Sequence, residues 1–143
     1  MTSNASRVDH YLHAVAAMGV PEAVSDFSAP DVIFHEFPNR IVPRGRVSRF
    51  ADLGAAYEQG RKILKSQEYE VQRVVEAGDE VAVELEWRGI LAVSGDEFAR
   101  RQRNERFLTF RDGKIVSQRS YACYPPFGEQ PGAGPSAGLF AYE

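Results

Sequence analysis

The chain has 143 residues, a formal net charge of −3 and one cysteine. This length suits one domain that buries its own core, and a lone cysteine excludes an internal disulfide framework. The slightly acidic balance argues against general nucleic-acid binding, which needs a basic surface. No apolar run is long enough to span a membrane, and the polar N-terminus has no signal-peptide core. We therefore expect a cytoplasmic protein with neither a nucleic-acid nor a membrane partner.

The first half of the chain carries helical patterns. Five residues recur at helical spacing within residues 6–19, namely Val8, Tyr11, Leu12, Val15 and Met18. This spacing predicts a first helix there. A short second helix is expected from Pro21 to about Phe27, and a third from about Val47 to Leu64. Between the second and third helices, the segment DVIFHEF at residues 31–37 is typical of a strand.

From Gln67 onward the pattern changes to strict alternation. The segments QEYEVQRVVEA, EVAVELEW, RRQRNERFLTF and KIVSQRSYACY predict four consecutive strands. The dipeptides Gly78-Asp79 and Asp112-Gly113 are hairpin-turn signals between them. Segregated helices followed by hairpin-linked strands indicate an α+β fold. A strongly curved antiparallel sheet wrapped around a helix would leave a cavity at its open end.

The chain divides into a domain at residues 1–124 and a tail at residues 125–143. The tail holds four prolines and four glycines in nineteen residues, so we expect it to be largely irregular. Three large apolar residues nevertheless cluster near its end: Leu139, Phe140 and Tyr142. We expect these to dock on the cavity mouth or on a partner subunit, and a loose tail is the alternative.

Three segments carry a resemblance to a known family: YLHAVAAMGVPEAVSDF, DVIFHEFPNRIVPRG and RFLTFRDGKIVSQRSY. In this order, over residues 6–124, they resemble the SnoaL-like and ketosteroid isomerase-like branch of the nuclear transport factor 2-like superfamily. The resemblance implies a cystatin-like cone of curved sheet around helices with a central cavity. It also implies a homodimer that pairs through the outer face of the sheet. Members of this fold include isomerases, cyclases, hydrolases, dehydratases and non-catalytic binders, so the fold alone does not decide the function.

Glu36 is the expected general base. It shares a strand face with Phe34, and an apolar neighbourhood makes a carboxyl group a better base near neutral pH. The resemblance points to the same residue, because the family base ends the first strand nine residues before a loop glycine, here Gly45. The alternative is a solvated side chain that pairs with Arg40 or Arg44.

Tyr11 and Arg106 are the expected stabilisers of an anion. The resemblance matches Tyr11, by its spacing to Phe27, with a helix tyrosine that donates a hydrogen bond to an oxyanion. Arg106 departs from the family pattern, because the isomerases place a protonated aspartate there. An arginine stays charged and could hold a carboxylate or an enolate. The alternatives are that Tyr11 is a core residue and that the strand slips by one, so that Phe107 faces inward.

The remaining expected cavity residues come from the same alignment of the final hairpin and from large apolar side chains. They are Phe34, Tyr57, Trp87, Asn104, Leu108, Phe110, Gln118 and Ser120. Ser120 stands where the epoxide hydrolases of the superfamily have an aspartate, which weakens that reaction class here. With only three histidines in the chain, we expect no metal site, and we expect no cofactor.

These expectations combine into an acid–base enzyme, an isomerase or cyclase acting on a hydrophobic carbonyl compound such as a polyketide-like substrate. Its partners would be a small hydrophobic or anionic molecule and a second copy of the chain. The outer sheet face would carry Glu84, Glu86, Arg101, Arg103, Arg119 and Tyr121. The alternatives are a non-catalytic binding or association module, and a cofactor-free lyase or hydrolase that activates water.

Overall fold

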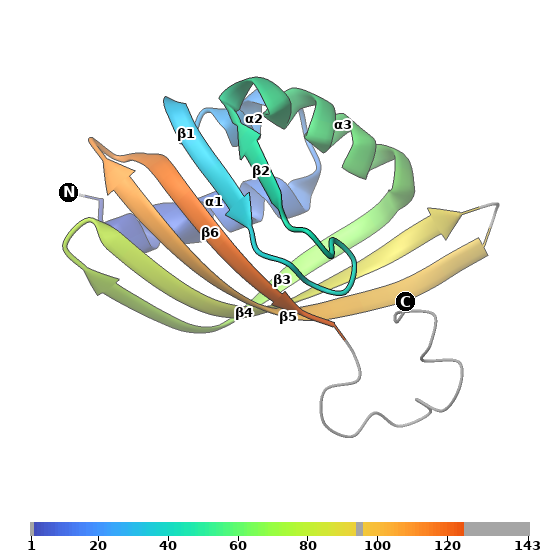
Figure 1. Ribbon diagram of the computed structural model, residues 1–143. Helices are drawn as coiled ribbons and strands as arrows, with labels where there is room; N and C mark the ends of the chain where they lie inside the picture. The colour runs from blue at the N-terminus through green and yellow to red at the C-terminus, as the bar shows by residue number, and fades with distance from the viewer. Residues whose placement is uncertain (1, 94–95, 125–143) are drawn as a thin grey trace.

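A computed structural model describes residues 2–93 and 96–124 of the chain. A curved six-stranded sheet holds the helices on its inner side (Figure 1). The helical elements are α1 (Asn4–Ala17), α2 (Glu22–Ser25), the 3-10 turn η1 (Phe50–Asp52) and α3 (Leu53–Ile63). The strands are β1 (Ser28–Glu36), β2 (Arg46–Arg49), β3 (Leu64–Ala77), β4 (Glu80–Val93), β5 (Asp96–Arg111) and β6 (Lys114–Cys123). The expected α+β fold with a curved sheet is confirmed.

The strand order in the sheet is β2-β1-β6-β5-β4-β3. Strands β3 to β6 form the predicted antiparallel series, and both predicted hairpin turns use left-handed backbone, with φ of 59° at Gly78 and 78° at Gly113. Strand β1, however, pairs with β6 in parallel. The sheet is therefore mixed, and the expectation of a wholly antiparallel sheet is wrong at this one pairing.

The segment from Arg46 to Asp52 differs from the predicted third helix. It contains β2, which pairs antiparallel with β1, and then η1, so that α3 begins at Leu53 rather than near Val47. The turn before β2 needs Gly45, because its φ is 73° and a Cβ atom there would lie 2.7 Å from the Glu36 carbonyl oxygen. The carboxylate of Asp52 accepts a hydrogen bond from the backbone N–H of Arg49 at 2.8 Å, which starts the helical segment.

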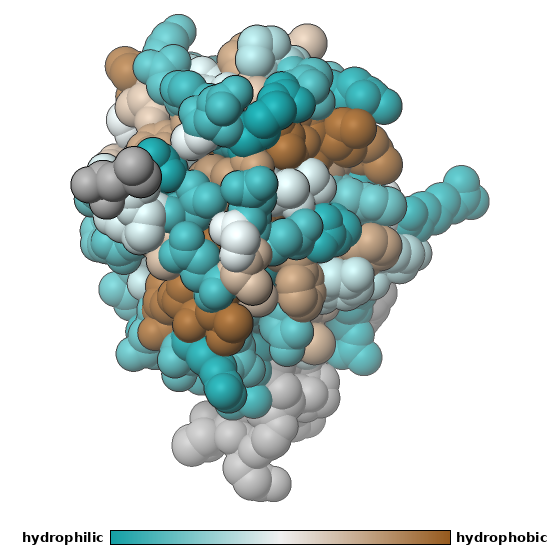
Figure 2. All heavy atoms as spheres, turned by 90° about the vertical axis from the view of Figure 1, so that its left-hand side faces the viewer, coloured by the Kyte–Doolittle hydropathy of each residue, from teal (hydrophilic) through white to brown (hydrophobic). Residues whose placement is uncertain are grey.

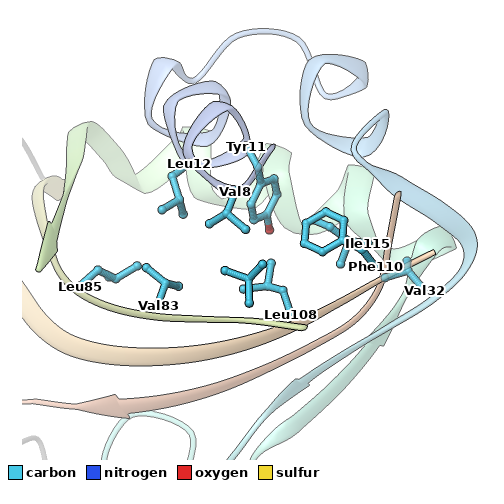
Figure 3. Close-up of a cluster of buried hydrophobic side chains, with 10 residues drawn as sticks. Val8, Tyr11, Leu12, Val32, Val83, Leu85, Leu108, Phe110 and Ile115 are labelled. Atoms are coloured by element: carbon cyan, nitrogen blue, oxygen red, sulfur yellow. The ribbon is translucent and has the colours of Figure 1, made fainter. Parts of the chain in front are cut away.

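The core lies between α1 and the inner face of the sheet. Ser3 caps α1 by accepting a hydrogen bond from the backbone of Ser6, so the helix begins at Asn4. The buried apolar side chains include Val8, Tyr11, Leu12, Val32, Val83, Leu85, Leu108, Phe110 and Ile115 (Figure 3). This cluster fills the inner face of the sheet under α1.

Figure 2 shows one face of the molecule, with mostly hydrophilic residues and separate small apolar areas. None of the helices in the described part of the chain has the length and apolar character that a bilayer crossing requires. The tail at residues 125–143, with Leu139, Phe140 and Tyr142, lies outside the described residues, so its expected docking stays a prediction.

Candidate functional site

A cavity of about 220 Å³ lies beside the core, where β1, β2, β5 and β6 run next to one another. Its lining residues are Phe34, His35, Glu36, Arg46, Ser48, Gln102, Asn104, Arg106, Gln118 and Ser120. Nine of these ten side chains are polar or charged. The cavity is therefore suited to a ligand with polar or charged groups.

The sheet register places the two charged groups of the predicted site in one row. Glu36 on β1 pairs with Ser120 on β6, and Ser120 pairs with Arg106 on β5. Neighbouring strands lie roughly 4.7–4.9 Å apart, so the Cα atoms of Glu36 and Arg106 are about 10 Å apart. Their long side chains can thus approach a single small ligand from two sides.

The orientation of β5 resolves the predicted ambiguity between Arg106 and Phe107. Arg106 lines the cavity with Asn104, and Leu108 is only 1% exposed in the core, so these residues share the inner face. Phe107 points outward and packs edge-on against Tyr121, with ring centroids 5.8 Å apart. Alternation along the strand explains both placements, since burying Leu108 brings Arg106 to the same face.

Glu36 lies at the cavity mouth with a side chain that is 30% exposed. Its Oε1 atom accepts a hydrogen bond from Arg46 Nη2 at 3.2 Å, and its Oε2 atom accepts one from Asn39 Nδ2 at 3.3 Å. The carboxylate is thus held by two donors rather than by apolar neighbours alone. Its ion-pair partner is Arg46, not Arg40 or Arg44, because β2 brings Arg46 opposite Glu36.

Asn39 reaches Glu36 because the loop after β1 is folded around its side chain. The Oδ1 atom of Asn39 accepts hydrogen bonds from the backbone N–H groups of Ile41 and Val42, both at 2.9 Å. This Asx-type turn fixes the amide, so that Nδ2 faces the carboxylate of Glu36. Asn39 is therefore a positioning residue for the predicted base.

Arg106 is a partly buried cation surrounded by neutral groups. Its Nε atom donates to Asn104 Oδ1 at 3.0 Å, and its guanidinium carbon lies 5.2 Å from the centroid of the Tyr69 ring. Burial tends to lower the pKa of Arg106, but Tyr69, Tyr11 and the more distant Glu36 raise it above its usual value. Within residues 2–93 and 96–124, no carboxylate pairs directly with this guanidinium. Its charge is thus available to an anionic ligand.

Tyr11 lies behind the cavity rather than in its lining. Its side chain is 6% exposed, and its ring meets Phe27 edge-on with centroids 5.7 Å apart. Burial raises the pKa of Tyr11 to about 12, although Arg106 and a hydrogen bond from Gln118 oppose the rise. The ring is thus part of the core, while the hydroxyl stays protonated and lies next to two cavity residues.

The stability of the protein should fall above about pH 10, because the Tyr11 phenol ionises more readily in the unfolded chain than in the folded protein. The unfolded phenol releases its proton near pH 10, whereas the folded one holds it until about pH 12. Between these values the unfolded state binds fewer protons, so this group removes about 1.4 kcal/mol of unfolding free energy per pH unit. Urea unfolding of the wild type and Tyr11→Phe at pH 9, 10 and 11 should show a steeper loss above pH 10 in the wild type. Parallel pH profiles would contradict this assignment.

Asn104 was expected to bind ligand, but both ends of its amide are already engaged. The Oδ1 atom accepts from Arg106 Nε and from Ser120 Oγ at 3.3 Å, and Nδ2 donates to Gln102 Oε1 at 2.6 Å. Gln102 in turn donates to the Tyr124 hydroxyl at 2.7 Å. Among the described residues Gln102 accepts from one of the two Nδ2 hydrogens, so the other can still meet a ligand in the cavity. Asn104 therefore orients Arg106 through Oδ1 and keeps a donor for a ligand.

The expected apolar wall is only partly assembled, because Phe34 alone of the five large apolar candidates lines the cavity. Leu108 and Phe110 lie in the core at 1% and 3% exposed. Trp87 packs against that core and donates its indole N–H to Gln67 at 2.8 Å. The fifth, Tyr57, lies on α3 with a buried hydroxyl that has no partner among the described residues. These four residues therefore belong to the core or to α3 and do not form a wall of this cavity.

Four residues near the site were not predicted from the sequence. They are Asn39, Arg46, Tyr69 and Gln102. The alternating pattern of β3 could have placed Tyr69 on the inner face, because Tyr69 pairs with Trp87 on β4. No sequence pattern pointed to Arg46, because its ion pair with Glu36 depends on the short strand β2. The residues that the structure describes contain no group of three His, Cys, Asp or Glu side chains that could hold a metal.

The comparisons with known proteins agree with this fold. A family model for the SnoaL-like domain matches residues 8–118. No curated protein matches the chain. IdmH of Streptomyces antibioticus, described as a candidate polyketide cyclase, is 19% identical with a TM-score of 0.70, over 85% of this chain and 92% of IdmH. A candidate SnoaL-like polyketide cyclase from Shewanella putrefaciens is 12% identical with a TM-score of 0.70, over 85% of this chain and 90% of that one.

A third solved structure, from Catenulispora acidiphila, has a ketosteroid isomerase-like fold and was solved with trimethylamine. It is 19% identical with a TM-score of 0.65, over 80% of this chain and 83% of that one. At these identities the likeness establishes the fold alone, which is a ketosteroid isomerase-like fold. Because the family model covers most of the domain, the chain belongs to the SnoaL-like domain family.

Proposed function

We propose that the protein is a cofactor-independent acid–base enzyme of the isomerase or cyclase type that removes a proton from a carbon next to a carbonyl group. The observation that carries this proposal is the row of Glu36, Ser120 and Arg106 across three neighbouring strands. Glu36 would accept the proton, and Arg106 would bind the enolate or a substrate carboxylate. A fixed cation at the developing negative charge stabilises the transition state, because it needs no reorganisation during the reaction.

The contacts of Glu36 favour an acidic carbon as the site of reaction. Each carboxylate oxygen already accepts one hydrogen bond, from Arg46 or Asn39, so the negative charge that would take up a substrate proton is shared with two donors. The proton next to the carbonyl group of an ordinary ketone is less acidic, so its removal would require a stronger base. A carbon between two carbonyl groups, as in polyketide-like compounds, gives up its proton more readily. The proposed substrates are therefore 1,3-dicarbonyl compounds that contain an anionic or easily ionised group.

Proton abstraction can be measured without knowledge of the natural substrate. The probe is ethyl 2-methylacetoacetate, whose single proton between the two carbonyl groups exchanges with deuterium in D2O and disappears from the proton NMR spectrum. The protein should accelerate this exchange, whereas androst-5-ene-3,17-dione should be isomerised poorly. Efficient isomerisation of the steroid, with no acceleration for the dicarbonyl probe, would overturn the proposed substrate class.

A non-catalytic binding module is the second candidate, and the ion pair between Glu36 and Arg46 favours it. An ion pair at the mouth of a cavity can be structural, since Glu36 ends β1 and Arg46 begins β2. In that case Arg106 would bind an anionic ligand, and the protein would not remove a proton from any carbon atom of that ligand. The exchange assay separates the two candidates, because a binding module would leave the exchange rate of the probe unchanged.

We also propose that two copies of the chain pair through the outer face of the sheet. A hollow of about 820 Å³ lies there, and the outward-facing residues in its lining include Glu84, Glu86, Arg103, Glu105, Phe107 and Tyr121. Tyr121 is 44% exposed and stacks on Phe37 with centroids 4.4 Å apart. Aromatic area among charges of both signs suits a self-complementary interface.

Sedimentation velocity at micromolar concentration should show a dimer of the wild type. Tyr121→Glu should shift it to a monomer, because the added charge would be buried next to Glu84, Glu86 and Glu105 in the interface. Val20→Glu is the control, since Val20 is 61% exposed between α1 and α2, away from the outer face. A wild type that sediments as a monomer throughout the concentration range would refute this pairing.

A further inference from the structure

A chain of three hydrogen bonds leads from Arg106 along β5 to the residue that follows β6. The Nε atom of Arg106 donates to Asn104 Oδ1 at 3.0 Å, and Asn104 Nδ2 donates to Gln102 Oε1 at 2.6 Å. Gln102 Nε2 then donates to the hydroxyl of Tyr124 at 2.7 Å. The cation of the cavity is thus connected to Tyr124 through two side-chain amides.

The cation at its start fixes the direction of this chain. A guanidinium has donors and no acceptor, so the amide of Asn104 must face Arg106 with its oxygen and Gln102 with its nitrogen. The amide of Gln102 must in turn face Asn104 with its oxygen, which makes the Tyr124 hydroxyl the acceptor at the far end. Exchanging oxygen and nitrogen in either amide would place two donors or two acceptors opposite each other. Only one orientation of both amides keeps all three bonds.

The chain holds one side of the guanidinium and leaves the other side to a ligand. Because Nε is engaged, a ligand in the cavity can meet only the N–H groups on the two Nη atoms of Arg106. Ser120 Oγ donates to the same Asn104 Oδ1 atom at 3.3 Å, and an amide oxygen has two lone pairs for these two donors. The amide that holds the cation is itself buried, with Asn104 only 3% exposed.

Loss of the Gln102 acceptor would disturb Arg106 through the amide between them. Nδ2 of the buried Asn104 would lose an acceptor where water has little access, which is costly. Rotation of the Asn104 side chain toward another acceptor would move Oδ1 away from Arg106. The position of the cation therefore depends on a residue that is four positions away on the same strand.

We propose that Gln102 and Tyr124 are positioning residues of the anion site, which act through Asn104 on the guanidinium of Arg106. Gln102 fixes the plane of the Asn104 amide, and the Tyr124 hydroxyl fixes Gln102. This inference rests on the proposed function, because it concerns the same cation, and it adds the residues that hold this cation before a ligand arrives. A donor that is already in place needs no rearrangement when negative charge develops on the ligand.

The first test reads the position of Arg106 in the ligand-free protein. The measured quantity is the rate at which its Nε–H proton exchanges with water, followed by 1H–15N NMR, and Arg106→Leu identifies the signal by its absence. Gln102→Met keeps a similar volume and removes the strong acceptor, so the exchange should become about fivefold faster. An unchanged rate would overturn the proposal.

Two further substitutions show whether the acceptor of Gln102 is responsible. Gln102→Glu keeps an acceptor for Asn104, and the Tyr124 hydroxyl can rotate to donate to the second carboxylate oxygen, so the slow exchange of the wild type should be retained. Gln59→Met makes the neutral substitution at an exposed position on α3 and should also leave the rate unchanged. Fast exchange in Gln102→Glu would refute the role of this acceptor.

Tyr124→Phe tests the far end of the chain. It removes one oxygen atom from a partly exposed side chain, so it should fold even if Gln102→Met does not. The Nε–H exchange of Arg106 should become about twofold faster, because Gln102 loses one of its two bonds in the chain. A wild-type rate would remove Tyr124 from the chain, and it would overturn the whole proposal if Gln102→Met does not fold.

The second test connects the chain to ligand binding. Benzoate is the probe, because it places an anion on a single ring that suits a cavity of about 220 Å³, and benzamide is its neutral counterpart. NMR titration of Gln102→Met should show a benzoate affinity that is about fivefold lower and a benzamide affinity near the wild-type value. In an Arg106→Leu background, Gln102→Met should not weaken benzoate further. An equal loss in both backgrounds would show direct contact between Gln102 and the ligand and would refute the positioning role.

The proposed function and this inference can fail separately. If Gln102→Met changes both Nε–H exchange and benzoate affinity, but the dicarbonyl probe shows no protein-dependent exchange at carbon, the chain positions the cation of a binding module. If the wild type accelerates exchange of the dicarbonyl probe and Gln102→Met changes neither quantity, the proposed function stands and the positioning role is wrong.

Discussion

Replacing Glu36 by glutamine is expected to abolish deuterium exchange of ethyl 2-methylacetoacetate. The amide has nearly the same shape as the carboxylate but cannot accept a proton from carbon. A positioned general base contributes about 10²–10⁴-fold to a reaction rate, so the protein-dependent rate should fall at least about 100-fold. Benzoate should still bind Glu36→Gln, because Arg106 holds the anion on another strand. The loss would therefore lie in the chemical step and not in binding.

Two comparisons make this experiment specific. Glu22→Gln changes an exposed carboxylate on α2 in the same way, and its exchange rate should equal that of the wild type. Near-complete activity of Glu36→Gln would show that Glu36 is the structural partner of Arg46 only, and the assignment of the base would be wrong. Thermal unfolding of both variants controls for a loss of folded protein, since Glu36→Gln also weakens the ion pair at the start of β2.

Arg106→Leu is expected to weaken the binding of anionic ligands by about 2 kcal/mol, roughly 30-fold. This is the scale of a hydrogen bond to a charged group that is lost from a partly buried site. The effect should be large for benzoate and small for its neutral analogue benzamide, because only the anion gains from the guanidinium. NMR titration of the two ligands against both proteins gives the four affinities required.

The design of this variant avoids a large cost in stability. The described partners of Arg106 are neutral, namely Asn104 and Tyr69, so its removal leaves no buried carboxylate without a counter-ion. Replacing a buried charge by an apolar side chain is often neutral or stabilising. Arg61→Leu, at an exposed position on α3, is the control for the loss of one positive charge. Unchanged benzoate affinity in Arg106→Leu would remove the anion site from the proposed mechanism.

Much of the fold could be predicted because its long elements repeat a simple pattern. The alternation of Val81, Val83, Leu85 and Trp87 along β4 already separates an inner from an outer face. The Asp112-Gly113 turn joins β5 to β6 in the predicted hairpin. Strand β2 was missed, because four residues with mixed polarity carry no detectable period, and its pairing depends on the turn at Gly45.

The candidate site could be predicted only in its parts. The resemblance to the family's final hairpin, combined with the side-chain period of two, predicted Arg106, Gln118 and Ser120 on the inner face, with Phe107 as the alternative to Arg106. The partners of these groups come from other elements. Arg46 meets Glu36 through β2, and Tyr69 reaches Arg106 on β5 from β3, which is not a neighbour of β5.

The sequence by itself determined the α+β class and the order of the long strands, whereas the structure decided that Arg106 and not Phe107 faces inward. Local periodicity and turn chemistry are properties of neighbouring residues, so they are readable from the chain. Only the tertiary structure decided that the cavity lining is polar. Helix α1 packs on the inner face and buries Leu108 and Phe110, which removes the expected apolar wall from the cavity. Tyr69 lies beside Arg106 for the same reason, because the partners of a buried group come from segments that are distant in the sequence.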